Sequence, residues 1–192
     1  GSPSAPQVTS GFIGSSSKVT VTRPAETTLK WYKSNSKGEI DKTSQIGEGE
    51  TLTYSVASTS EKVWVVPYSV LNCEGTPLSV EIVTTPLPVA VTATVPANVC
   101  DNAVAKLTLK STETGTMYRA YKQAGIDNWE SSPSLEIEGT GSQAEANLPN
   151  VGTYKVFAEK KDAMNVVKTA ECGVISVNRY EKVTGNVDAV ER

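Results

Sequence analysis

Histidine is absent from all 192 residues of the sequence. Its absence removes the commonest general base of enzymes and excludes every Ser-His or Cys-His catalytic arrangement. Ser15-Ser-Ser-Lys18 has the Ser-x-x-Lys spacing of serine acyl-enzymes, but it lies in a polar turn instead of opening a helix. Glu136 and Glu138 fit a solvated strand face better than the cleft of a glycosidase. We therefore expect no enzyme activity and no cofactor.

An excess of basic residues is also missing, as are long hydrophobic runs. The 18 Lys and Arg residues are outnumbered by 21 Asp and Glu residues, which gives a net charge of −3 at pH 7. A nucleic-acid-binding face needs the opposite balance. No apolar run reaches the roughly 18 residues that would cross a membrane. We expect neither a nucleic-acid partner nor membrane insertion. Gly1 and Ser2 resemble a cloning remnant, so we expect a piece of a longer protein.

Cysteine is scarce, with three residues. Without histidine or a Cys-x-x-Cys motif, we expect no zinc or other metal site. Cys100 and Cys172 flank the second half of the chain and predict a structural disulfide, which would place the protein in an oxidising, exported environment. Such a bridge would raise the free energy of unfolding by roughly 4 kcal/mol, because it restricts the unfolded chain. The alternative is two buried thiols in a reduced protein. Cys73 is left over as a free thiol, unless it pairs between chains.

The sequence is rich in short strand patterns. In the first half, residues 18–23, 28–33 and 78–83 place apolar side chains on one face with the period of a half-buried strand, and residues 51–56 and 62–70 predict two further strands. Trp31 in the second of these strands is the expected core anchor. Residues 34–50 are polar and glycine-rich, and predict a loop or short edge strands.

The second half repeats this plan around residues 148–158, where Tyr154, Val156 and Ala158 share one face of a predicted strand. A leucine, a glycine and a tyrosine just before such a strand are typical of a tyrosine corner. Residues 159–170 have no sustained apolar stripe and predict a hairpin instead of a helix. The chain as a whole predicts an all-β fold with two tandem immunoglobulin-like β-sandwich domains.

The predicted domain boundaries follow two prolines. Pro86 and Pro88 make a stiff, extended linker between a first domain, residues 1–86, and a second domain, residues 87–180. Residues 181–192 predict a linker or the start of a following module.

The second half resembles the immunoglobulin-like repeats of very large exported surface proteins of Bacteroidota. The motifs that carry the resemblance are Val99-Cys100, Leu107-Thr-Leu109, Gly115-Thr-Met-Tyr118, Gly139-Thr-Gly141, Leu148 followed by Gly152-Thr-Tyr154-Lys-Val156-Phe-Ala158, and Cys172. The first half is similar to a sister repeat type through Trp31-Tyr32 and Asn72-Cys73-Glu-Gly75. It departs from that repeat where an early cysteine should stand, and Trp64 replaces the usual tyrosine. We expect Trp31, Trp64 and Tyr154 to form the structural core.

The resemblance implies an extracellular, non-catalytic stalk or adhesin segment, exported by the type IX system and serving adhesion or gliding motility. Its partners would be neighbouring immunoglobulin-like domains, a surface glycan or another protein. One alternative is a carbohydrate-binding or accessory module of a secreted polysaccharide-degrading enzyme. Another is a surface-docking module that continues into a sorting domain after Tyr180.

The candidate ligand contact is Trp129, in the polar stretch of residues 125–130. A tryptophan beside Asp127 and Asn128 suits a sugar ring, with the apolar face of the sugar on the indole and its hydroxyls on the polar groups. The competing interpretation is that Trp129 folds back over the end of the sandwich or packs against the neighbouring domain. Asp101-Asn102 and residues 162–165 offer oxygen ligands for calcium without an EF-hand pattern.

Overall fold

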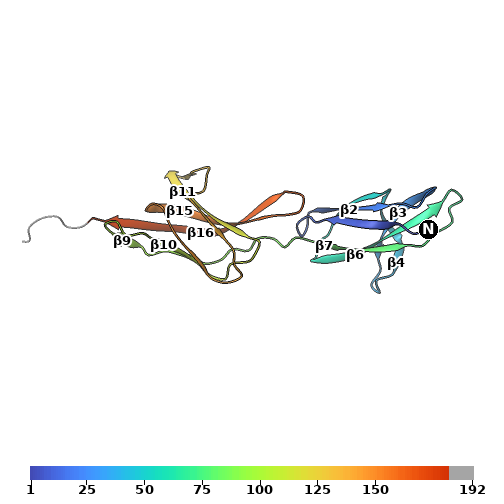
Figure 1. The fold of residues 1–192 in the computed structure, drawn as a ribbon, viewed down its shortest axis with the longest axis horizontal. Helices are drawn as coiled ribbons and strands as arrows, with labels where there is room; N and C mark the ends of the chain where they lie inside the picture. The colour runs from blue at the N-terminus through green and yellow to red at the C-terminus, as the bar shows by residue number, and fades with distance from the viewer. Residues whose placement is uncertain (182–192) are drawn as a thin grey trace, which may run out of the picture. The chain divides into compact units, whose positions relative to one another are not determined.

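The structure is a computed structural model that describes residues 1–181 (Figure 1). The chain divides into two compact units, residues 1–87 with 161–167 and residues 88–160 with 168 onward. Within the described residues every regular element is a β-strand, so the predicted all-β class is confirmed. The predicted linker or module at residues 181–192 lies, apart from its first residue, outside the described residues.

The first unit is a sandwich of two antiparallel sheets. One sheet has the strand order β1-β2-β5 and the other has the order β4-β3-β6-β7. The seven strands are β1 (Ser4–Thr9), β2 (Ser16–Thr22), β3 (Thr27–Ser34), β4 (Ile40–Glu48), β5 (Thr51–Ser55), β6 (Ser60–Ser69) and β7 (Leu78–Val83). Of the two alternatives predicted for residues 34–50, a loop or short edge strands, the edge strand is found, because β4 forms there at the edge of the sheet and pairs with β3.

The core of the first unit is built by the inward positions of these strands. Trp31 is completely buried among valine, leucine and isoleucine side chains from both sheets, of which the largest are Leu29, Leu52 and Ile82. Its indole Nε1–H donates a hydrogen bond of 2.8 Å to the carbonyl of Gly49. The ring therefore fills the core while its one polar atom is satisfied in the turn after β4.

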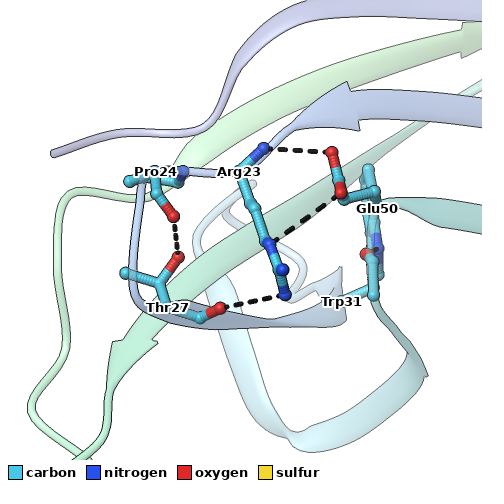
Figure 2. A network of polar contacts seen from close by, with 6 residues as sticks. Arg23, Pro24, Thr27, Trp31 and Glu50 are labelled. Atoms are coloured by element: carbon cyan, nitrogen blue, oxygen red, sulfur yellow. Dashed lines mark hydrogen bonds and ion pairs between the residues drawn. The ribbon is translucent and has the colours of Figure 1, made fainter.

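That turn is joined to the turn after β2 by a polar network (Figure 2). The Arg23 amide donates to the Glu50 carboxylate at 3.3 Å, and the Arg23 guanidinium donates to the Thr27 carbonyl at 3.4 Å. The Thr27 hydroxyl donates to the Pro24 carbonyl at 2.7 Å. Both ionic side chains are about half exposed, so their pairing contributes little energy. Its role is geometric, since it positions the turn that receives Trp31.

Trp64 is not part of the core, and its prediction as a core residue is wrong. Its neighbours Val63 and Val65 on β6 are completely buried, so strand alternation directs Trp64 to the outer face of the sheet. There it is half-buried, and its Nε1–H donates to the Gly38 carbonyl at 3.2 Å.

The second unit is a sandwich with the same plan. Its small sheet has the order β14-β10-β8, and its large sheet has the order β12-β11-β15-β16-β9, with β13 also paired to β11. The strands are β8 (Ala93–Thr94), β9 (Asn98–Cys100), β10 (Lys106–Leu109), β11 (Met117–Gly125), β12 (Asn128–Trp129), β13 (Leu135–Glu138), β14 (Ala144–Asn147), β15 (Gly152–Lys161) and β16 (Val167–Tyr180). The hairpin between β15 and β16 lies where the sequence predicts it.

Tyr154 on β15 has the geometry of a tyrosine corner. Its side chain is completely buried, and its hydroxyl donates a hydrogen bond of 2.7 Å to the carbonyl of Asn150, four residues upstream. Val156 and Ala158 are completely buried on the same face of the strand. Burial raises the pKa of the Tyr154 hydroxyl, which keeps it protonated as the donor.

A parallel pairing of an early segment with the chain at or just after the last strand is common to both units. In the second unit β9 pairs in parallel with the end of β16. In the first unit Phe12 forms a parallel bridge with Thr85. The early segment therefore lies beside the end of β16 in the second unit and beside the residues directly after β7 in the first.

Candidate functional site: an aromatic groove on the second unit

The outer face of the large sheet in the second unit carries the candidate site. Tyr121 on β11 lies opposite Lys155 on β15, and Arg119 lies opposite Phe157. The alternate residues of both strands are buried in the core, so strand period two directs these four side chains to the solvent face. Core and site are thus built by opposite faces of the same two strands.

Three aromatic side chains line a cleft of about 270 Å³ on this face. Tyr121 and Phe157 pack edge to face, with ring centres 5.9 Å apart and an interplanar angle of 74°. The third ring is Trp129 on β12, which pairs with Gln123, two residues along β11 from Tyr121. The arrangement provides a mostly apolar surface that stays partly open to solvent.

Lys155 is the cation at this surface. Its Nζ lies 4.7 Å from the centre of the Trp129 ring and 3.5 Å from a carboxylate oxygen of Glu171. The ammonium group is therefore held over the indole by a cation–π interaction and restrained from the side by an ion pair.

Glu159 lies at the inner end of the cleft, where its side chain is 11% exposed. One of its oxygens accepts a 2.9 Å hydrogen bond from the Tyr121 hydroxyl, and the other is paired with the Arg119 guanidinium. Arg119 also lies 3.7 Å from Glu136. The hydrogen bond to Glu159 raises the pKa of Arg119, and burial together with Glu159 raises the pKa of Tyr121. These groups support the cleft as a fixed network.

Asp127 and Asn128 do not line the cleft beside Trp129. Both are exposed at the tip of the β11–β12 hairpin, next to Ile126, which is 94% exposed. Asp127 has φ = 51°, so it occupies the left-handed position of a tight turn. The polar stretch of residues 125–130 is a tight hairpin, because β11 continues to Gly125 and the chain returns at once as β12. The tryptophan is consequently placed by strand pairing, and its two polar neighbours point elsewhere.

The predicted Cys100–Cys172 disulfide is wrong. All three cysteines are free thiols, with Cys73 and Cys100 exposed and Cys172 half-buried. The reason is strand register, since Cys100 on β9 lies opposite Tyr180 on β16. Cys172 is eight residues earlier on that same strand, roughly 26 Å away at the rise of an extended chain. A disulfide needs Cα atoms within about 7 Å.

A second aromatic cluster occupies the outer face of the first unit. The hydroxyls of Tyr32 and Tyr68 lie 2.9 Å apart, and both rings are nearly buried. Lys30 Nζ lies 5.1 Å from the ring centre of Tyr68, and Lys42 Nζ lies 5.6 Å from that of Tyr32. Burial and the hydrogen bond with Tyr68 raise the pKa of Tyr32 to about 12. Because both rings are buried, unlike the half-buried rings on the second unit, the cluster is a packed layer and not an open cleft.

Of the two oxygen-rich turns considered for calcium, the one at residues 162–165 is organised by hydrogen bonds of its own. One carboxylate oxygen of Asp162 accepts bonds of 2.9 Å from the amides of Met164 and Val166, which closes the β15–β16 turn. Within residues 1–181 no group of three or more cysteine, aspartate or glutamate side chains is arranged to hold a metal ion. The same range contains no helix long and apolar enough to span a membrane.

Comparison with solved structures identifies the architecture. A marsupial T cell receptor matches 95% of this chain and 74% of its own chain, with a TM-score of 0.62 and 9% sequence identity. The fold is immunoglobulin-like. Weaker matches include murine CEACAM1b (TM-score 0.45, 10% identity, 92% of this chain and 100% of that one) and a two-domain fibronectin type III segment of chicken tenascin (TM-score 0.36, 12% identity, 91% and 98%). No protein-family model and no curated protein matches the sequence.

Sequence reasoning identified Trp129 and missed most of its surroundings. Phe157 lies between Lys155 and Glu159 on the outer face of β15, and the neighbouring positions on the inner face, Val156 and Ala158, are buried. An aromatic residue at such a position is a usable signal, because a solvated strand face favours polar side chains. No sequence pattern indicates that Trp129 lies close to Lys155. The two residues meet only because β12 and β15 both pair with β11, each in a particular register.

Proposed function

We propose that this chain is a non-catalytic segment of a large exported cell-surface protein and serves as a stalk or adhesin repeat. The observation that carries the proposal is the structural role of the motif residues that resemble the Bacteroidota surface repeats. Leu107, Leu109 and Tyr118 are core residues, and Tyr154 forms the tyrosine corner. A motif made of core and corner residues specifies a sandwich and leaves its surface free to vary.

The proposed setting is extracellular, at the surface of a bacterium of this phylum, after export by the type IX system. The proposed partners are neighbouring immunoglobulin-like domains of the parent chain and a glycan or protein on another surface. The free thiols remove the disulfide argument for an oxidising environment. Export therefore rests on the repeat resemblance, and adhesion or gliding motility is the role it supports.

A second candidate function is a carbohydrate-binding or accessory module of a secreted polysaccharide-degrading enzyme. The aromatic groove favours it, because Tyr121, Trp129 and Phe157 share one open cleft. The two candidates differ in what the segment must contribute. A stalk needs length and stability, whereas a binding module needs this particular surface.

The test begins with antibodies raised against this chain and applied to intact cells that carry the parent gene. Labelling of intact cells is expected. An in-frame deletion of the segment should then reduce attachment of the cells to a surface. Cells that are unlabelled and attach normally after the deletion would contradict the proposal.

Replacement separates a stalk from a binding segment. An unrelated pair of immunoglobulin-like domains of equal length should restore attachment if the segment acts as a spacer. Failure of that replacement, with recovery by the original segment, would assign the binding itself to these residues.

A further inference from the structure

We propose that the aromatic groove of the second unit binds one neutral sugar ring of a surface polysaccharide. This inference rests on the proposed adhesive function and adds the ligand class and the site. The groove is the outward cleft formed by Tyr121, Trp129 and Phe157 with the polar side chains of Lys155, Glu130 and Thr169 around it.

The floor of the groove suits the apolar face of a sugar. Pyranose rings present C–H groups on one face and hydroxyls around the edge, so they stack on aromatic rings and bond sideways to polar groups. The edge-to-face packing of Tyr121 on Phe157 holds those two rings in place. Trp129 is held by the pairing of β12 with β11. Such a preformed surface loses little conformational freedom when a ligand binds.

The rim of the groove offers both donors and acceptors. Lys155 has three N–H donors, of which the ion pair with Glu171 engages one side. Glu130 is exposed and contributes carboxylate acceptors, and the Thr169 hydroxyl can donate or accept. Hydroxyl groups of a sugar also do both. A rim with both hydrogen-bond donors and acceptors therefore matches a polyhydroxylated ring better than it matches a ligand that can only donate or only accept hydrogen bonds.

The charges around the groove favour a neutral ligand. Glu159 is already paired with Arg119, and Glu171 is already paired with Lys155, so a charged sugar could pair with these groups only by disturbing existing ion pairs. Glu130 on the rim would also repel the carboxylate or sulfate of an acidic sugar, and Lys155 would repel an amino sugar. A neutral hexose needs no ion pair to be disturbed and meets no like charge.

The volume of the groove limits the contact to a short ligand segment. About 270 Å³ lies just under the range of roughly 300 to 1,000 Å³ that is typical of small-molecule pockets. A single ring fits, and the open side of the cleft lets a polymer continue in both directions. Binding should therefore be weak for one ring and stronger for a cell surface that carries many chains of the parent protein.

The experiment titrates the whole chain with soluble β-glucan, mannan and galactan oligosaccharides, followed by calorimetry and by NMR of the indole N–H groups. At least one neutral oligosaccharide should bind and shift the Trp129 signal. Trp129→Ala should weaken that binding roughly thirtyfold, as expected for loss of a central aromatic contact. Trp64→Ala is the matched control, because Trp64 is a half-buried tryptophan on the outer sheet face of the other unit.

Thr169→Val guards against a folding artefact of the tryptophan change. Valine keeps the shape of threonine and removes only the rim hydroxyl, so binding should weaken about fivefold while the sheet stays intact. Polygalacturonate and chitosan oligosaccharides provide the charged comparisons, and both should bind more weakly than the best neutral ligand.

Three results would overturn the inference: no binding of any neutral oligosaccharide, unchanged binding in Trp129→Ala, or tightest binding to a charged one. These results leave the cell-attachment tests untouched. If deletion of the segment still abolishes attachment, the sugar assignment fails alone and the adhesive function stands.

Discussion

Removing the hydroxyl of Tyr154 should destabilise the second unit by about 1 kcal/mol. The Tyr154→Phe change deletes one hydrogen bond, of 2.7 Å, to the carbonyl of Asn150 and leaves the completely buried ring in place. The net value of such a bond is about 0.5 to 1.5 kcal/mol, because water satisfies both partners in the unfolded chain. Asn150 is an exposed residue, so its carbonyl can recover a water partner in the variant, which favours the middle of that range.

The measurement is urea unfolding followed by NMR of the three indole N–H signals, because Trp129 lies in the second unit and Trp31 and Trp64 lie in the first. With an m value of roughly 1 to 2 kcal/mol per molar urea, the loss lowers the Trp129 midpoint by about 0.5 to 1 M. The control is Tyr180→Phe, which removes a hydroxyl from a residue that is 61% exposed and should leave the midpoint nearly unchanged. Equal midpoints for Tyr154→Phe and the native chain would refute the stabilising role of this corner.

Three further predictions concern titration, packing and thiols. The folded chain holds the Tyr32 proton up to about pH 12, whereas an unfolded tyrosine releases it near pH 10, so the free energy of unfolding should fall as pH rises between those values. Urea titrations across this window should show a shallower fall for Tyr32→Phe, and an unchanged slope would contradict the assignment. Gly139→Ala places a Cβ 1.8 Å from the Glu113 carbonyl oxygen, so it should lower the free energy of unfolding by more than about 2 kcal/mol in the same assay. Gly125→Ala is the control, because its Cβ would have its nearest contact at 3.9 Å and should lower that free energy far less. Thiol titration of unfolded, unreduced monomer should give three free thiols per chain, and a value of one would restore the disulfide.

Strand alternation predicted most of the fold because the sandwich buries one face of each strand. The predicted strand at residues 78–83 is β7 with the same bounds, and the predicted tyrosine corner is present at Tyr154. At β4 (Ile40–Glu48) the polar sequence left two alternatives open, a loop or short edge strands, and the edge strand is the one that forms. This strand lies at a sheet edge and pairs only with β3, so backbone hydrogen bonds hold it and little apolar burial marks it. A pattern of side chains cannot report bonds made by the backbone.

The disulfide prediction failed for a related reason. Cys100 and Cys172 lie at symmetric places along the chain, near the first and last strands of the second unit. Whether they meet depends on how β9 is aligned with β16, and that alignment places Cys100 beside Tyr180. A strand of 14 residues gives many possible partners for a three-residue neighbour. Spacing along the sequence therefore could not decide which one is used.

The groove shows how the same period that builds a core can also build a site. In the middle of β15 (Gly152–Lys161), Tyr154, Val156 and Ala158 are buried, and the residues that alternate with them, Lys155, Phe157 and Glu159, all face the cleft. The residues on the inner face are constrained by core packing, so their apolar pattern can be recognised in the sequence. The residues on the outer face need only be compatible with solvent, and any polar side chain would meet that requirement. Phe157 and Trp129 depart from that minimum, and the oligosaccharide titration tests whether a bound sugar accounts for them.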